Sequence, residues 1–183
     1  RDSYPLVGFG LIGEGLFRLG LLLNARRNNE REWMKVKAST ARDHIVLCGL
    51  GTLGFRILEQ LQKTGEEVVA IEIDGKARFV SIAMNAGTTV LVSDAKDEAA
   101  LVEAGIATAR AIIIATSDDL ANIEIALDAR RLNPGVKIVM RQFDQQIAAK
   151  IKEAKIADVA FSSTALAAPR VAEMSLELAG ARK

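Results

Sequence analysis

From residue 44 onward, short apolar runs alternate with longer amphipathic stretches. Each run has the length of a buried strand, and the stretches between runs carry apolar residues at helical spacing. The apolar runs lie at residues 44–48, 67–72, 88–92, 111–115, 136–140 and 157–161. Strands separated by helices predict right-handed βαβ units and a parallel sheet.

The amphipathic stretches predict six helices. In the first of them, four residues share one helical face: Gly54, Ile57, Leu58 and Leu61. Gly65 follows as a helix stop. Further helices are expected near residues 75–86, 97–104, 118–132 and 144–155, with a last one over residues 163–179.

A glycine turn joins the first strand to the first helix. Gly49 permits the tight turn, Gly51 leaves room for a pyrophosphate, and Gly54 lets the helix pack closely on the strand. The second strand ends in Glu72, 18 residues after the last glycine (72 − 54), close to the spacing of about 20 typical of dinucleotide sites. The expected fold is therefore α/β, a Rossmann-like doubly wound parallel sheet of six strands in the order 3-2-1-4-5-6.

The segment before this domain has a different character. Residues 5–23 are apolar and rich in glycine, but they carry Glu14 and Arg18, which are costly in a membrane. Between Arg18 and Arg42 there are seven basic residues and two acids, as expected on the cytoplasmic side of a membrane. Two interpretations fit: residues 1–23 are the cytoplasmic end of a longer transmembrane helix, or a soluble amphipathic helix that packs on a partner.

These features divide the chain into four expected parts. They are the apolar helix at residues 1–23, a basic linker at 24–43, the nucleotide-binding domain at 44–162 and a C-terminal helix at 163–183. In the linker, Trp33 and Met34 are expected to pack against other residues, with an interfacial anchor as the alternative.

Composition narrows the function classes. A formal net charge of +1 gives no reason to expect a nucleic-acid partner. The single cysteine, Cys48, excludes a disulfide within one chain and a zinc cluster, which fits a reducing compartment. Cys48 lies in the first strand and is expected to be a small buried hydrophobe.

Ligands of open α/β sheets bind at the carboxyl ends of the strands. The candidate cofactor-binding residues there, including the glycine turn, are Gly49, Gly51, Thr52, Leu53, Gly54, Glu72, Ile73, Asp74, Asp94, Ala95, Thr116, Ser117 and Arg141. Glu72 is expected to accept hydrogen bonds from the adenosine ribose, and Asp94 to accept one from the adenine amino group. Thr116 and Ser117 are expected near the phosphates or the second ribose. Ser93, at the end of the third strand, is a further polar residue at this edge of the sheet.

Two sets of polar residues at these strand ends have alternative roles. Arg141 fits either a phosphate ligand or a surface or interface ion pair. Asp118 and Asp119 fit the site, but capping the following helix is the commoner role of aspartate in such a position.

Catalytic residues are scarce. The only histidine, His44, precedes the first strand on the side away from the expected site, and the only tyrosine, Tyr4, lies outside the domain. We therefore expect no catalytic residues, no metal site and no enzyme activity. A nucleotide site without acid–base groups indicates a sensor.

Five motifs carry a resemblance to a known family. They are His-Ile-Val-Leu-Cys-Gly-Leu-Gly-Thr-Leu-Gly at residues 44–54, Ala-Ile-Glu-Ile-Asp at 70–74, Val-Ser-Asp-Ala-Lys-Asp at 92–97, Ala-Thr-Ser-Asp-Asp at 115–119, and Asn-Pro-Gly-Val-Lys-Ile-Val-Met-Arg at 133–141. In this order they resemble the RCK domain, the Trk-type NAD-binding (TrkA-N) regulatory domain of potassium channels and transporters. The resemblance covers residues 44 to about 161. The segment before it, residues 1–23 with the linker, is similar to the end of a pore-lining inner helix in channels with a cytoplasmic gating ring.

The resemblance implies binding of NAD(H), or of ADP or ATP, by a domain on the cytoplasmic face of the cell membrane. It also implies homo-oligomers, with dimers arranged in a tetrameric or octameric ring under a membrane pore domain. Two residues depart from the family pattern: Glu72 stands where many members have aspartate, and Thr52 where many have arginine. The loss of that cation favours NAD or a diphosphate over a triphosphate.

Three functions follow from these observations. The first is a regulatory domain of a potassium channel that binds an adenine nucleotide to control gating. The second is a soluble Trk-type subunit of a potassium transporter, and the third is a small NAD-dependent oxidoreductase.

Two helices carry apolar stripes that bear on assembly. One stripe consists of Leu120, Ile123 and Leu127, and the other, in the last helix, consists of Val171, Met174 and Leu178. One stripe is expected to cover the sheet. The last helix is expected either to form a dimer contact across a two-fold axis or to fold back on its own sheet.

Overall fold

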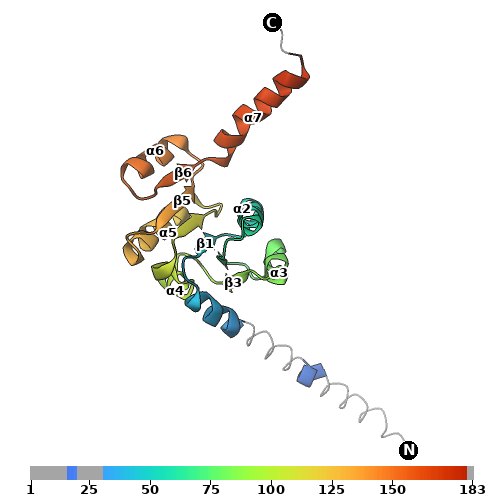
Figure 1. The fold of residues 1–183 in the computed structure, drawn as a ribbon, viewed down its shortest axis with the longest axis vertical. Helices are drawn as coiled ribbons and strands as arrows, with labels where there is room; N and C mark the ends of the chain where they lie inside the picture. The colour runs from blue at the N-terminus through green and yellow to red at the C-terminus, as the bar shows by residue number, and fades with distance from the viewer. Residues whose placement is uncertain (1–15, 20–30, 181–183) are drawn as a thin grey trace, which may run out of the picture.

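The fold is a twisted sheet with helices on both faces (Figure 1). The computed structural model describes residues 16–19 and 31–180 of the 183-residue chain. The strands are β1 (Ile45–Cys48), β2 (Val68–Glu72), β3 (Thr89–Val92), β4 (Ala111–Ile114), β5 (Lys137–Arg141) and β6 (Val159–Phe161). The helices are α2 (Thr52–Lys63), α3 (Arg78–Asn85), α4 (Glu98–Glu103), the 3-10 helix η1 (Ile106–Thr108), α5 (Asp119–Leu132), α6 (Gln145–Glu153) and α7 (Ser163–Leu178).

The sheet confirms the expected topology. Its six strands are all parallel and run in the order β3-β2-β1-β4-β5-β6. The chain leaves β1 for β2 on one side and later returns to place β4 on the other side of β1. This reversal next to β1 is the point at which open α/β sheets bind ligands.

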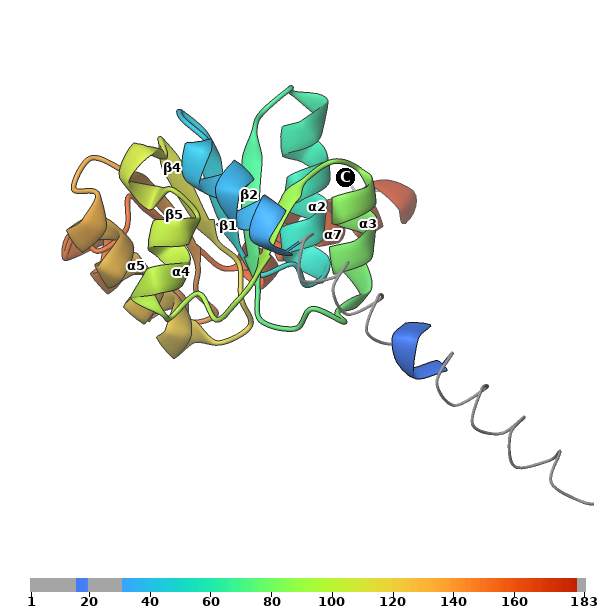
Figure 2. The same ribbon diagram turned by 90° about the horizontal axis from the view of Figure 1, so that it is seen from below.

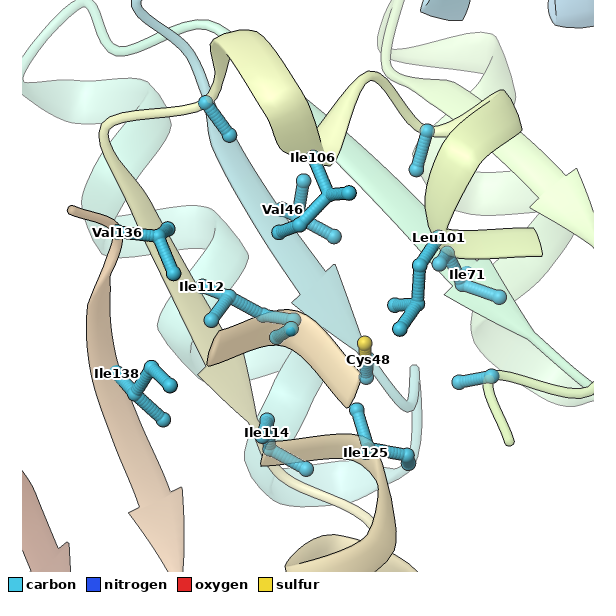
Figure 3. Close-up of a cluster of buried hydrophobic side chains, with 14 of the residues drawn as sticks. Val46, Cys48, Ile71, Leu101, Ile106, Ile112, Ile114, Ile125, Val136 and Ile138 are labelled. Atoms are coloured by element: carbon cyan, nitrogen blue, oxygen red, sulfur yellow. The ribbon is translucent and has the colours of Figure 1, made fainter. Parts of the chain in front are cut away.

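Alternate residues of each strand enter two separate cores. Val46 and Cys48 of β1 pack with α4 and α5 on one face, whereas Leu47 packs with α2 and α3 on the other. Figure 2 shows these two helix pairs on opposite sides of the strands. Figure 3 shows the first core, where side chains from β1, β4 and β5 meet those of α4 and α5. The two-residue alternation of a strand is the physical reason for this division.

The predicted stripe of α2 is confirmed. Gly54 and Leu58 are buried, and Ile57 and Leu61 are partly buried against the second core. A stacked pair of rings, Phe55 on α2 and Phe79 on α3, joins the two helices with ring centroids 4.4 Å apart.

A helix over residues 31–40 packs against the domain. Ala38 and Ala41 are buried in the first core, and Met34 packs against it as expected. Lys35 Nζ lies 3.2 Å from Glu103 Oε1. The prediction that Trp33 packs against other residues is wrong, because Trp33 is 66% exposed. Met34 and Ala38 are four residues apart and share the helical face that meets the core, and Trp33 lies off that face. The core thus includes residues N-terminal to the expected boundary at 44.

The expected apolar helix at residues 1–23 lies mostly outside the described residues. Of that segment the structure describes residues 16–19, which are helical. Across the described parts of the chain, residues 16–19 and 31–180, no helix is both long and apolar enough to cross a bilayer.

The sheet-facing side of α5 is not the leucine stripe. Leu120 is 75% exposed and Leu127 is 51% exposed, and of the three stripe residues Ile123 alone packs, partly buried, against the first core. The buried side carries mainly alanine and Ile125. The buried side chain of Asn122 fixes this rotation, because its amide donates to the Arg141 carbonyl at 3.0 Å and its oxygen bonds the Thr116 hydroxyl. A hydrogen-bonded polar group thus outweighs the apolar stripe.

The last helix, α7, runs outward from the end of β6 (Figure 1). Within the described chain none of its residues is buried. It therefore does not fold back on its own sheet, which removes one of the two alternatives for this helix.

We predict that the burial of Cys48 makes stability depend on alkaline pH. Desolvation raises the pKa of this thiol from 9.0 to about 12. The neutral thiol contributes its full stability below pH 9, and the contribution is lost as pH rises toward 12, because the unfolded chain ionises first. The free energy of unfolding in urea should fall by about 2 kcal/mol more between pH 8 and 10.5 in the natural chain than in Cys48→Ala. Parallel pH curves for the two proteins would contradict the burial of the thiol.

Candidate functional site

A cavity of about 790 Å³ opens at the carboxyl ends of the strands, beside the start of α2. This volume is within the range of small-molecule sites. Polar and charged lining residues are Thr52, Arg56, Glu72, Ser93, Asp94, Lys96, Thr116, Ser117, Asp118, Arg141 and Ser163. The remaining lining residues are Gly49, Gly51, Leu53, Ile71, Ile73, Ala95, Ala115, Ala121 and Ile125.

The glycine turn forms one wall of the cavity. Gly49 has a φ of +93°, and its N–H donates to the Ile71 carbonyl at 2.8 Å. A side chain at Gly54 would come within 1.9 Å of the Gly49 carbonyl oxygen, whereas one at Gly51 would meet no atom within 4 Å. Gly54 therefore holds α2 close to β1, and Gly51 leaves open space at the helix N-terminus.

The first N–H groups of α2 are available to a ligand. Gly51 is the N-cap, and no side chain in the described chain caps this helix. Uncapped N–H groups and the positive end of the helix dipole together favour an anion, above all a phosphate.

Glu72 stands where β2 ends, and its carboxylate spans the turn. Its Oε2 accepts from the Leu50 N–H at 2.6 Å, and its Oε1 accepts from the Asp74 N–H at 3.1 Å. Each carboxylate oxygen has two lone pairs, so both oxygens keep room for a ligand hydroxyl. The two backbone contacts fix the carboxylate at the cavity wall.

The ends of β3, β4 and β5 complete the wall. Asp94 Oδ1 accepts from the Lys96 N–H at 3.0 Å, and its Oδ2 lies 3.6 Å from Lys96 Nζ. The Arg141 guanidinium donates to the Thr116 carbonyl at 3.2 Å. This contact places Arg141 across the end of β4, where it lines the cavity.

Two of the thirteen sequence candidates lie outside the wall: neither Gly54 nor Asp74 is among the described lining residues. Gly54 acts through packing, and the Asp74 carboxylate accepts from the Lys76 N–H at 2.9 Å in its own turn. The other eleven candidates line the cavity, the expected place for the end of each strand.

The two aspartates after β4 are positioned by hydrogen bonds within the protein. Asp118 caps α5, as expected, by accepting from the N–H groups of Leu120 and Ala121. Asp119 accepts from the side chain of Gln142 and from the Phe143 N–H, both at 2.9 Å. Asp119 therefore joins α5 to the loop after β5.

Sequence reasoning missed three polar lining residues: Arg56, Lys96 and Ser163. Arg56 lies inside α2, and Ser163 comes from the start of α7, far along the chain. Lys96 adjoins Asp94 and Ala95, so its place in the Val-Ser-Asp-Ala-Lys-Asp motif was the one available signal.

His44 and Cys48 lie away from the cavity wall. His44 is buried before β1, where its Nε2 is 2.8 Å from the Ala104 carbonyl oxygen. In residues 16–19 and 31–180, no group of three or more histidine, cysteine, aspartate or glutamate side chains is placed to hold a metal ion.

The TrkA-N domain family matches residues 45–163 of this chain. The chain is 30% identical over 157 residues to an uncharacterized protein of Methanothermus fervidus, covering 83% of this chain and 24% of the relative. It is 32% identical over 99 residues to potassium channel protein 1 of Methanocaldococcus jannaschii, covering 54% and 30%. The chain thus spans between about a quarter and a third of these curated relatives.

Solved structures share the fold. The TrkA-N domain of the inner membrane protein ybaL from Escherichia coli superimposes with a TM-score of 0.64 at 24% identity, covering 76% of this chain and 98% of that one. The Shewanella denitrificans Kef CTD in its AMP-bound form gives 0.62 at 22%, covering 75% and 81%. The GsuK channel bound to NAD gives 0.57 at 20%, covering 66% and 21%.

The fold, the glycine turn at the switch point and the family match agree. The chain belongs to the TrkA-N domain family, the RCK-type domains.

We predict that alanine impairs ligand binding at Gly51 and folding at Gly54. Gly51→Ala should fold normally, because its methyl group meets open space, but should weaken nucleotide binding by about tenfold or more. Gly54→Ala should destabilise the fold itself, because its methyl group overlaps the Gly49 carbonyl. Thermal unfolding and calorimetric titration separate the two effects. Unchanged nucleotide affinity in Gly51→Ala would place the ligand elsewhere.

Proposed function

We propose that the chain is a ligand-sensing regulatory domain that binds NAD(H), or another adenine nucleotide, in the cavity at the sheet's switch point. One observation carries the proposal: the glycine turn, the uncapped start of α2 and the Glu72 carboxylate line one cavity. Such a site offers N–H donors to phosphates and an acceptor to a ribose, the two groups that all adenine nucleotides present.

The residues around the cavity fit an adenine dinucleotide. The α2 N–H groups, beside the open space at Gly51, would hold the pyrophosphate. Glu72 would accept from the adenosine ribose, and Asp94 would accept from the adenine amino group. Thr116 and Ser117 would lie by the phosphates or the second ribose, with Arg141 as the cation near them. Solved structures of the same fold described as bound to NAD and to AMP support this choice of ligand.

The biological setting that we propose is the cytoplasmic face of the cell membrane, in a potassium channel or transporter. The name of the relative in Methanocaldococcus jannaschii, a potassium channel protein, supports this setting. The helix over residues 31–40 packs into the domain core through Ala38, so it would move with the domain and pull on a pore segment before it. A soluble Trk-type subunit is the second candidate, and membrane fractionation of the native protein distinguishes the two.

We propose a binding role in place of catalysis. The only histidine, His44, is engaged with the Ala104 carbonyl before β1, away from the cavity wall. A small NAD-dependent oxidoreductase would need an acid–base group at the hydride acceptor. Oxidation of NADH with any carbonyl compound of a test panel would revive that third function.

Ser163 suggests how a bound ligand is sensed. It lines the cavity and is also the first residue of α7, the helix that leaves the domain without buried contacts. A ligand that touches Ser163 would favour one direction of α7 over others. By population shift, the ligand would then stabilise the assembly that this direction permits.

The surface beside α7 suggests what that helix contacts. Val159 of β6 is 47% exposed, and its neighbours Val139 and Phe161 are only partly buried. These residues lie on the same face of the sheet as α2 and α3. Those two helices cover this face at β1, β2 and β3. We propose that α7 of a second copy packs on this apolar surface of Val139, Val159 and Phe161. The contact would be part of a dimer within a tetrameric or octameric ring.

We predict that Glu72 selects NAD over NADP. The 2′-phosphate of NADP would face a carboxylate of like charge, so the natural chain should bind NAD+ and NADH and reject NADP+ and NADPH. Calorimetric titration of both pairs, together with ATP, ADP and AMP, measures this preference. In Glu72→Ala, NAD affinity should fall by about tenfold or more, because the ribose loses a charged acceptor.

Glu72→Gln is the matched control for this prediction. The amide keeps the size of the side chain and removes its charge, so it should reduce the preference for NAD over NADP. Equal or tighter binding of NADPH by the natural chain would refute the role given to Glu72. Binding of none of these nucleotides would refute the proposed function itself.

We predict that α7 drives self-association. The natural chain should sediment as a dimer or larger, and a chain ending at Ser162 should associate more weakly. Met174→Asp should weaken association as well, because it puts a charge into the stripe of Val171, Met174 and Leu178, all exposed in the single chain.

Ala172→Asp is the matched control on α7. It adds the same charge to the same helix at an exposed position, but residues two apart do not share a helical face. It should leave association unchanged. A natural chain that sediments as a monomer at tens of micromolar, with and without nucleotide, would remove both the dimer and a gating mechanism that depends on it.

A further inference from the structure

The second turn of α2 carries a cation that the glycine pattern does not reveal. Arg56 lines the cavity together with Thr52 and Leu53. It follows Thr52 by four residues, so it lies one turn further along the same helical face. Long side chains in helices point back toward the N-terminus and cover the preceding turn. The Arg56 guanidinium is therefore within reach of the end of α2 where the uncapped N–H groups lie.

The current partner of Arg56 is weakly held. Arg56 Nη1 donates to Glu59 Oε2 at 2.7 Å, and the Arg56 side chain is 71% exposed. Such exposed pairs within one helix contribute little to stability, because water screens both charges. Glu59 is not among the described residues that line the cavity. A phosphate at the start of α2 would offer Arg56 a charge-assisted, bidentate hydrogen bond that is stronger than the Arg56–Glu59 pair.

The other two cations of the described wall have partners within it. Lys96 Nζ lies 3.6 Å from Asp94 Oδ2, at the end of β3. Arg141 donates to the Thr116 carbonyl, at the end of β4. Arg56 differs from both, since a ligand can displace Glu59 from its guanidinium without breaking a contact within the cavity wall.

We infer that Arg56 binds the outer phosphate of a nucleoside diphosphate unit and leaves Glu59 when that ligand enters. This inference rests on the nucleotide site proposed above. With the adenosine ribose at Glu72, the phosphate next to that ribose lies by Gly51 and the first N–H groups of α2. The second phosphate then lies beyond it, where the arginine one turn up the helix can reach it. The site thereby prefers ADP or a dinucleotide over AMP.

The test compares two ligands that differ by this phosphate. Calorimetric titration of the full chain with ADP and with AMP gives the affinity of each. In Arg56→Gln the ADP affinity should fall by about tenfold or more, whereas the AMP affinity should change less than about twofold. In Glu59→Gln, which frees Arg56, the ADP affinity should rise and the AMP affinity should stay unchanged.

Lys63→Gln is the matched control. It removes the same charge from the same helix at an exposed position outside the described cavity wall, and it should change the ADP affinity less than about twofold. Equal losses for ADP and AMP in Arg56→Gln, or no loss for either, would overturn the inference while leaving the nucleotide site intact. A natural chain that binds neither ligand would instead refute the site itself. Unchanged thermal unfolding shows that each variant is folded.

Discussion

The close contact between Gly54 and the Gly49 carbonyl determines where this domain can bind a ligand. A β-carbon on Gly54 would lie 1.9 Å from that oxygen, so α2 begins directly above the end of β1 only because the side chain is absent. The left-handed conformation of Gly49 turns the chain sharply enough to allow this approach. The start of α2 then lines the cavity beside β1, the strand at which the strand order reverses. Glu72 strengthens the same arrangement, since it accepts from the Leu50 N–H within the turn.

Much of the fold follows from local pattern, because apolar runs and helical spacing report burial directly. The six strands, their order and the glycine turn were predictable for that reason, and so were the polar residues at the strand ends. The rotation of α5 was not, since it depends on hydrogen bonds that join Asn122 to the Thr116 hydroxyl and to the Arg141 carbonyl on the next strand, and the apolar pattern does not report such bonds. Arg56 and Ser163 were missed for a related reason: a residue inside a helix, or after the last strand, reaches the cavity only through the three-dimensional path of the chain.

The two faces of the sheet are covered to different extents, and this asymmetry relates the fold to assembly. On one face, α4, α5 and the helix over residues 31–40 build a continuous core with β1 and its neighbours. On the other face, the second core extends from α2 and α3 over β1, β2 and β3, and Val159 on β6 remains half exposed. Apolar surface of this kind, next to a helix without buried contacts, is more typical of subunit interfaces than of monomers.

The strand β1 joins two parts of the molecule with different roles. The helix over residues 31–40 packs just before its first residue, and the glycine turn begins just after its last. Four strand residues span only about 13 Å, and β1 is hydrogen-bonded on both sides, to β2 and to β4. Hydrogen bonds on both sides hold β1 as an integral part of the sheet. A movement of the sheet at its carboxyl edge would therefore carry the helix over residues 31–40 with it, because Ala38 and Ala41 are buried in the core that β1 shares.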